Sequence, residues 1–427
     1  MLKHLFQSTV VIIALVSIVG CSATGSAKVL QSNQPREMTP DVSDSAVDAV
    51  AEGNQAFALD LYRYLKNEQS GNLFYSPHSI SIALAMTYAG ARGETETEMA
   101  ETLHFTLPQD KLHPAFNALD LVLASRGEDA EGKDDEGFRL RIANRLWGQE
   151  GYDFLDQFLD TLARNYGAGL GLLDFSEDPE GARQTINDWV SDETEERIED
   201  LLPPGSIMPA TRLVLANAIY FNAAWAEPFE EDDTADGPFT TVDGQEVTVP
   251  MMHQTARFPY AEVEGIQAIE LPYDGHEIGM VILLPPEGDL ARFEDQLDGA
   301  TLEDLLRAMD AQQVALTMPQ FEFESRFKLN DALKALGMPS AFSGAADFSG
   351  MTGDRSLFIG SVHHKAFVGV DEAGTEAAAA TAVVMLESAA PADEPVEMTL
   401  DHPFIFLIRD RETGAILFVG RIADPTA

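Results

Sequence analysis

Apolar residues recur at intervals of three and four in some stretches of the chain and are nearly continuous in others. Asp48–Asn67 carries Phe57, Leu61 and Leu65 at helical spacing, which predicts an amphipathic helix. Arg212–Phe221 is almost wholly apolar, which predicts a strand buried on both faces. Helical patterns gather in the N-terminal half and strand patterns in the C-terminal half, without regular alternation. The chain is therefore predicted to be α+β.

The same patterns predict the remaining elements. Further helices are expected at residues 153–166, 182–202, 290–309 and 329–336. Further strands are expected at residues 73–75, 138–142, 170–175, 279–284, 314–323, 364–370, 403–408 and 415–420, the last two as a hairpin. Ser76 is a good N-cap and Pro77 is tolerated in a first helical turn, so a helix that is apolar on most sides should follow. Gly90 or Gly93 should end it.

The stretch Val370–Ala390 does not fit these patterns, since beyond Glu372 it holds mostly small residues. Its composition favours a linker or a helix, because alanine is the best helix former. The alternative is a segment that enters a β-sheet, where alternate side chains share one face. The side chains on that face would be Thr375, Ala377, Ala379, Thr381, Val383 and Met385. They are smallest at the leading end, as insertion between two packed strands requires.

The N-terminus resembles an export signal. The apolar run Val10–Gly20 is too short to cross a bilayer as a helix, and it ends in I-V-G-C at Cys21, which resembles the lipobox of bacterial lipoproteins. Residues 1–20 are therefore predicted to be a signal peptide and Cys21 the site of lipid attachment. The alternative is an ordinary secretory signal with an incidental cysteine.

The predicted organisation is a flexible tether over residues 21–47 and a folded domain over residues 48–427. Cys21 is the only cysteine, so no internal disulfide can form. The expected location is the cell envelope, at the outer membrane or the cell surface, with the protein anchored by its lipid or alternatively secreted.

Charge and motifs narrow the function classes. The chain carries 27 basic and 71 acidic residues, which argues against a nucleic-acid binder. It has no G-x-S-x-G elbow, no Walker loop and no G-x-G-x-x-G motif that opens a helix. His276-Glu277 begins like a zinc-protease motif, but Met280 stands where the second histidine should be. No catalytic residue, metal site or cofactor is predicted, and the chain does not resemble an enzyme.

Four separated segments, in the same order as in the family, resemble the serpins, a family of serine protease inhibitors. They are Asn72–Thr95 with its S-P-x-S-I core, Leu213–Phe229 with L-V-L-A-N-A-I-Y-F-N-A-A-W, Val362–Ala380 with V-D-E-A-G-T-E-A-A-A-A, and His402–Arg421 with H-P-F-I-F. The resemblance covers about residues 50–425.

The resemblance implies a serpin fold with three β-sheets, about eight to nine helices and an exposed reactive-centre loop at about residues 372–398. The loop would be held outside a five-stranded sheet in a metastable state. A target serine protease would take the loop as a substrate and form a covalent acyl-enzyme. The cut loop would then insert into the sheet and deform the protease before the acyl bond is hydrolysed.

The resemblance also assigns roles to residues. The hinge of the loop would comprise Glu372, Gly374, Thr375, Glu376, Ala377, Ala378, Ala379 and Ala380. A polar cluster called the shutter, beneath the opening sheet, would comprise Ser76, Ser79, Asn217 and His364, and Trp225 would lie at the breach, where the loop first enters. Ser76 could also be only a helix cap and Trp225 only a core aromatic. Because the residues after Glu376 in the hinge are all small, an active inhibitor is predicted.

The family's spacing from Glu372 puts the scissile bond between Ser388 and Ala389. No Lys or Arg lies between Gly374 and His402, which disfavours a trypsin-like target and favours an elastase-like or subtilisin-like one. A count shorter by one residue would make Glu387 the specificity residue, for a glutamyl endopeptidase. A count shorter by two would make it Leu386, for a chymotrypsin-like or cathepsin-like enzyme.

The expected partners are a target protease and, through the lipid on Cys21, a membrane. The region after Leu112 is acidic, so a heparin-type polyanion is not expected, and neither is nucleic acid. The protein is expected to be a monomer. Two alternatives remain, a non-inhibitory serpin that acts as a binding or storage protein and a lipid-anchored solute-binding protein.

Overall fold

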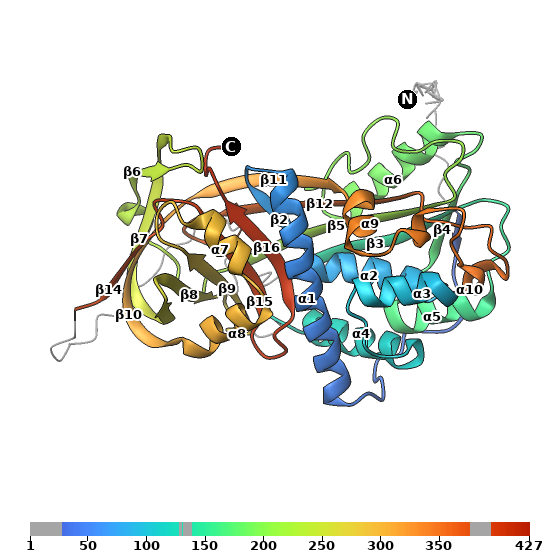
Figure 1. The fold of residues 1–427 in the computed structure, drawn as a ribbon, viewed down its shortest axis with the longest axis horizontal. Coiled ribbons are helices and arrows are strands. Elements are labelled where there is room, and N and C mark those ends of the chain that lie inside the picture. Colours follow the sequence, from blue (N-terminus) through green and yellow to red (C-terminus); the bar gives the residue numbers. More distant parts are fainter. Residues whose placement is uncertain (1–27, 128–129, 131–138, 376–393) are drawn as a thin grey trace, which may run out of the picture.

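The computed structural model describes residues 28–127, 130, 139–375 and 394–427 (Figure 1). Its α-helices are α1 (Asp44–Glu68), α2 (Pro77–Tyr88), α3 (Gly93–Thr102), α4 (Gln109–Ala124), α5 (Asp156–Tyr166), α6 (Pro179–Glu193), α7 (Leu290–Gln296), α8 (Gly299–Ala308), α9 (Asn330–Leu336) and α10 (Ser349–Thr352). In this part of the chain no helix is long and apolar enough to cross a membrane.

The strands confirm the α+β class. They are β1 (Lys28–Leu30), β2 (Leu73–Tyr75), β3 (Arg139–Gln149), β4 (Leu170–Leu173), β5 (Leu213–Ala224), β6 (Ala235–Thr240), β7 (Glu246–Val263), β8 (Ile266–Pro272), β9 (Ile278–Leu284), β10 (Asp310–Pro319), β11 (Phe321–Lys328), β12 (Ser361–Val370), β13 (Gly374–Thr375), β14 (Val396–Thr399), β15 (Phe404–Asp410) and β16 (Ile416–Ile422).

Seven strands form the first sheet, in the order β1-β4-β3-β5-β13-β12-β11. All twelve residues of β5 are buried, as its apolar sequence predicts. β5 and β12 run parallel and pair directly from Val214 opposite Ser361 to Ile219 opposite Ala366. We call this directly paired stretch the seam. The short strand β13 lies between β5 and β12 beyond one end of it.

The remaining strands form one continuous sheet of nine strands. The 18-residue β7 pairs with β6 along its first part, with β10 along its middle and with β8 at its end, so it joins the strands into a single hydrogen-bonded sheet. The described strands therefore form two sheets and not the expected three. The described residues hold ten α-helices, close to the expected eight to nine, and the helix expected at 290–309 contributes two of them, α7 and α8.

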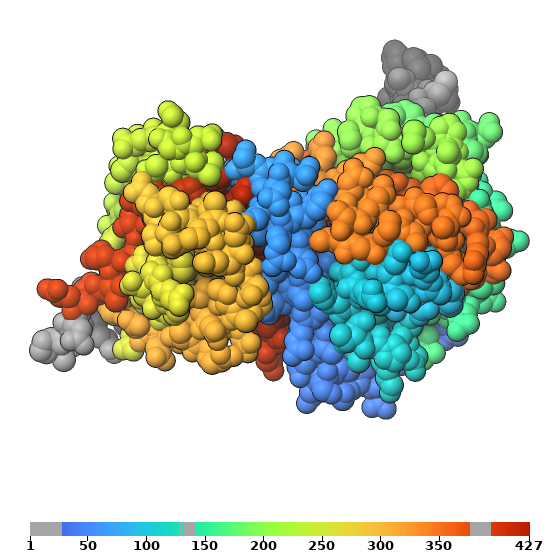
Figure 2. Space-filling view, viewed as in Figure 1, coloured from blue at the N-terminus to red at the C-terminus, as the bar shows by residue number. Residues whose placement is uncertain are grey.

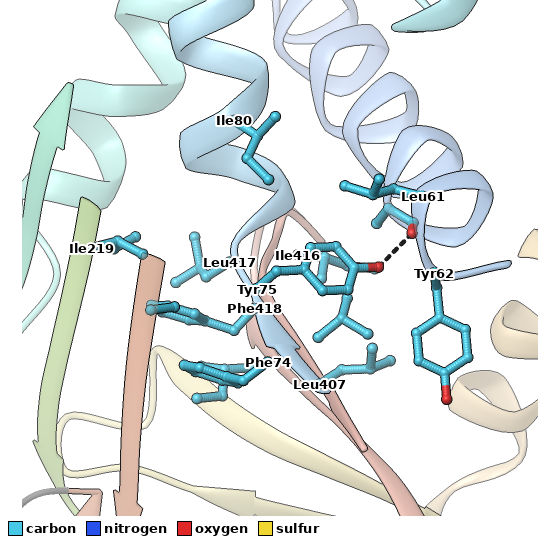
Figure 3. Close-up of a cluster of buried hydrophobic side chains, with 14 of the residues drawn as sticks. Leu61, Tyr62, Phe74, Tyr75, Ile80, Ile219, Leu407, Ile416, Leu417 and Phe418 are labelled. Carbon is cyan, nitrogen blue, oxygen red and sulfur yellow. Dashed lines mark hydrogen bonds between the residues drawn. The ribbon is translucent and has the colours of Figure 1, made fainter. Parts of the chain in front are cut away.

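The core is centred on β2 and the hairpin β15–β16, beneath α1 (Figure 3). Phe74 stacks on Phe418 with ring centroids 4.9 Å apart, and the Tyr75 hydroxyl donates to the carbonyl of Ala58 in α1 at 2.7 Å. The predicted strand Leu73–Tyr75 and the predicted hairpin are confirmed. This packing fixes α1 across the face of the molecule, between the nine-stranded sheet with its helices and the remaining helices (Figure 2).

Three predicted elements differ from the structure. The helix expected to reach Leu202 ends at Glu193, because Leu202 and its apolar neighbours fold back onto β5 and its amide donates to Asn187 Oδ1 at 2.8 Å. The helix expected at 290–309 breaks where Asp298 caps α8 by accepting from the Thr301 amide. The strand expected at 314–323 divides at Gln320 into β10 and β11, which belong to different sheets.

The predicted flexible tether also needs correction. Residues 28–47 are packed on the domain. Lys28–Leu30 forms β1 at the edge of the seven-stranded sheet, and α1 already begins at Asp44. The physical reason is that the polar residues of this segment pair with side chains and backbone groups of the domain, which the sequence pattern does not show.

Candidate functional site: the seam between two parallel strands

The seam is crossed by a buried cluster of polar side chains. Asn217 in β5 lies directly opposite His364 in β12, and Asn144 in β3 lies opposite Asn217 on its other side. Ser76 and Ser79 project from the start of α2. Ser76 Oγ accepts the Ser79 amide at 3.1 Å and so caps the helix, as predicted. All four predicted members of the shutter are thus brought together.

The hydrogen bonds of this cluster define the form of His364. The backbone amide of Ser76 donates to His364 Nε2 at 3.1 Å, so Nδ1 carries the ring proton and donates to Asn217 Oδ1. Complete burial lowers the pKa of His364 from 6.5 to about 3. The imidazole is therefore neutral at physiological pH, and its bond to Asn217 links the two strands of the seam.

The rest of the cluster satisfies the Asn217 amide. Asn217 Nδ2 donates to Ser79 Oγ at 2.5 Å and also to Asn144 Oδ1. Asn144 Nδ2 donates in turn to the Ser79 carbonyl at 3.1 Å. Besides the backbone pairing of the seam, separation of β5 from β12 would break the side-chain contact between Asn217 and His364. It would leave one donor and one acceptor that need a new partner.

The hinge enters the sheet at the breach. Trp225 stacks on Tyr273 with ring centroids 4.6 Å apart, and its Nε1 donates to the Asp371 carbonyl at 3.0 Å. Thr375 is only 1% exposed, and its hydroxyl lies 2.7 Å from the hydroxyl of Tyr273. Burial raises the pKa of Tyr273 well above its ordinary value, so this phenol stays protonated.

Glu372 is held at the mouth of the breach by uncharged partners. Gln320 Nε2 donates to both of its carboxylate oxygens at 2.7 Å, and Thr234 Oγ1 donates to one of them at 2.5 Å. The amide of Phe229 donates to the Glu372 carbonyl at 2.9 Å. These contacts fix the chain just before it turns into the sheet.

The turn requires glycine at position 374. A Cβ there would lie 2.1 Å from the carbonyl oxygen of Ala223 and 2.7 Å from Ala224 Cα, both backbone atoms of β5. Gly374 and Thr375 pair antiparallel with Ala224 and Ala223, and Thr375 pairs with Val370 of β12. The expectation that the whole loop lies outside the sheet is therefore wrong for these two residues, which already occupy strand positions.

Other predicted residues lie outside the described part of the chain. They are Cys21, the hinge residues Glu376, Ala377, Ala378, Ala379 and Ala380, the specificity residues Leu386 and Glu387, and the predicted scissile pair Ser388 and Ala389.

Sequence reasoning missed Asn144, Tyr273, Thr234 and Gln320. The available signal for Asn144 was an asparagine at a position of β3 where the alternation of Leu140, Ile142 and Leu146 predicts an apolar residue, and it gains meaning only from its register with Asn217. Within the residues that the structure describes, no three His, Cys, Asp or Glu side chains gather as a metal site would require.

The seam is thus a buried pair of parallel strands, and the two residues of a further strand, Gly374 and Thr375, lie between β5 and β12 beyond its end. Comparison with known proteins shows the family to which the chain belongs. The family model described as "Serpin (serine protease inhibitor)" matches residues 52–425, so the chain belongs to the serpins.

Individual relatives extend this assignment. An uncharacterized serpin-like protein of Thermococcus kodakarensis is 41% identical over 92% of this chain and 93% of its own length. The human leukocyte elastase inhibitor is 39% identical over 89% of this chain and all of its own. The fold is also similar to that in the crystal structure of human thyroxine-binding globulin in complex with thyroxine, with a TM-score of 0.80 and 31% sequence identity. This match covers 90% of this chain and all of the globulin.

The burial of His364 predicts a pH dependence. The unfolded chain binds a proton on this residue below about pH 6.5, whereas the folded protein does so only near pH 3. Stability should therefore fall as the pH drops through this window, by at most ~1.4 kcal/mol per pH unit for this residue. Urea midpoints measured between pH 7 and pH 4 should show a shallower decline for His364→Gln than for the unsubstituted protein. Parallel declines would contradict the assignment.

Proposed function

We propose that the protein is a suicide-substrate inhibitor of serine proteases that traps its target by inserting the cleaved loop between β5 and β12. The observation that carries the proposal is the position of Gly374 and Thr375, which pair with β5 in the antiparallel sense and point the chain along the seam. The same strand register can be extended to the residues that follow.

The register favours insertion of the whole loop. If the pairing of Thr375 with Ala223 continues, Ala380 would face Ala218 and Met385 would face Leu213, the first residue of β5. Gly374–Met385 therefore matches the length of β5. Residues 386–388 would lie beyond its end, so a protease attached to Ser388 would be carried past the end of β5.

Two independent registers agree on the residue that would enter the shutter. If the pairing of Thr375 with Ala223 of β5 continues, the residue opposite Asn217 is Thr381. If the pairing of Thr375 with Val370 of β12 continues, the residue opposite His364 is also Thr381. A threonine hydroxyl both donates and accepts, so it can satisfy the two groups that separation of the strands leaves without partners.

The chemistry at the predicted bond is acyl transfer. The serine Oγ of the protease would attack the carbonyl carbon of Ser388, the peptide bond to Ala389 would break, and the amine of Ala389 would leave with the proton taken from the serine. Insertion of the loop would then deform the protease before water can hydrolyse the ester that joins its serine to Ser388. The small side chains at Ser388 and Ala389 suit an elastase-like or subtilisin-like pocket, and similarity to the human leukocyte elastase inhibitor supports this choice.

The first test is to incubate the protein with elastase, subtilisin and a glutamyl endopeptidase. With at least one of the first two we expect a covalent complex that survives SDS, together with a released C-terminal fragment that begins at Ala389. A fragment that begins at Ser388 or Glu387 would assign specificity to Glu387 or Leu386. Cleavage without a stable complex in every case would contradict inhibition and favour a carrier, a role that the name of thyroxine-binding globulin states for that relative.

Thr381 provides a second test. In Thr381→Val the shape is retained but the hydroxyl is lost, so loop insertion would leave Asn217 and His364 without a partner. The loop-cleaved form should be destabilised by about 1–3 kcal/mol, while the uncleaved protein should be unchanged. Urea midpoints of both forms measure this, and Thr381→Ser is the matched control that should keep most of the stability. Equal midpoints for Thr381→Val and Thr381→Ser after cleavage would rule out entry of this residue into the shutter.

We also propose that the protein is exported and anchored by lipid on Cys21, with ordinary secretion as the alternative. The support is the apolar run that ends in I-V-G-C. Expressed in a bacterium with radiolabelled palmitate, the protein should carry label and partition into detergent, and Cys21→Ser should do neither. Unlabelled protein in the medium would favour secretion.

A further inference from the structure

The segment from Lys28 to Ser43 lies before the residues that the family model matches, yet it is built into the fold. We call it the N-terminal strap. Its first part, β1, pairs antiparallel with β4, with Val29 opposite Gly171, and so forms the outer edge of the seven-stranded sheet. The edge of the sheet that moves when a strand is accepted is therefore covered by a segment outside the family match.

Beyond β1 the strap contacts α5 and α4. The Ser32 hydroxyl donates to Asp160 of α5, and the Glu37 amide donates to the Arg164 carbonyl at the end of that helix at 2.9 Å. Arg36 forms an ion pair with Asp120 of α4.

A second side chain of α4 completes this attachment. The Arg36 Nε donates to Asn117 Oδ1 at 2.8 Å, and Asn117 Nδ2 donates to the Glu37 carbonyl at 2.5 Å. Asn117 is fully buried, so water cannot reach its side-chain amide. The oxygen and the nitrogen of this amide are instead both hydrogen-bonded to the strap.

The domain is shaped to receive the strap. A side chain at Gly169 would lie 2.7 Å from Val29 Cγ1 and 2.9 Å from the Leu30 carbonyl oxygen. Gly167 ends α5 in the left-handed conformation, with φ of 61°, and a Cβ there would approach Arg36 Cδ to 3.2 Å. Two glycines thus allow the close approach of the strap, which a loosely attached tether would not need.

The strap connects parts of the molecule that must separate when a strand enters the seam. Insertion between β5 and β12 moves the block β4–β3–β5, to which β1 is attached, away from β12 and β11. α4 packs against α1 as well as α5, and α1 also contacts β16 and α8, which lie in the half of the molecule that holds the nine-stranded sheet (Figure 1). The Arg36 contacts therefore join the moving edge to the static body.

We propose that the strap is a brake on opening of the seam and that Arg36 is its principal link. This inference rests on the proposed insertion of the loop and adds a control over its rate. A stiff link across the moving parts raises the barrier to strand entry, so it protects the uncleaved protein from spontaneous loop insertion. A brake would also slow insertion after cleavage.

The test measures opening without any protease. A synthetic peptide with the sequence of residues 375–388 is added to the full chain, and its incorporation is followed by native electrophoresis and by the gain in unfolding temperature. Arg36→Ala and Asp120→Ala remove opposite ends of the same ion pair. Each should accelerate incorporation roughly tenfold, the change in rate that corresponds to ~1.4 kcal/mol. The double variant should be no faster than the faster single variant.

Arg307→Ala is the matched control, because within the described residues Arg307 forms its ion pairs with Glu303 and Asp304 of its own helix. It should take up the peptide at the rate of the unsubstituted protein. Equal rates in Arg36→Ala, Asp120→Ala and Arg307→Ala would overturn the brake and leave the proposed inhibition intact. No uptake by any of the five proteins, including the unsubstituted one and the double variant, would overturn insertion itself and the brake with it.

Discussion

The structure depends on one pair of parallel strands whose backbone groups are satisfied by each other and could equally be satisfied by a third strand between them. β5 and β12 pair directly over six residues each and are separated only where β13 has entered. A buried backbone that loses its partner is costly, so the strands can part only as a new strand takes the place of each. In the proposed mechanism, entry of the loop would therefore be progressive, from the breach toward the shutter.

The polar side chains of the shutter are subject to the same need for hydrogen-bond partners as the backbone of the two strands. His364 is neutral because burial disfavours its charged form, and a neutral imidazole can both accept from Ser76 and donate to Asn217. A protonated ring would have no acceptor to offer Ser76 and would place a charge in the core. The cluster therefore links the two strands of the seam through polar groups, and in the proposed mechanism the hydroxyl of Thr381 would replace that link.

The elements of the fold were predictable from the sequence where burial of apolar residues alone determines the secondary structure. β5, β2 and the hairpin β15–β16 follow from continuous apolar residues and a turn at Glu412-Thr413-Gly414. The strap was not predictable, because its residues are polar and its order comes from partners such as Asn117, far along the chain. The end of α6 was missed because Ile198 and Leu201 keep helical spacing but pack on β5 from a non-helical backbone. The partners of the hinge, Tyr273 and Gln320, required the register of separate strands.

The central claim is that the loop becomes a strand between β5 and β12, and a crystal structure of the loop-cleaved protein tests it most directly. The account predicts that residues 375–385 lie antiparallel to both strands, with Thr381 between Asn217 and His364. A cleaved structure in which Val214 still pairs with Ser361 and Ile219 with Ala366 would contradict it.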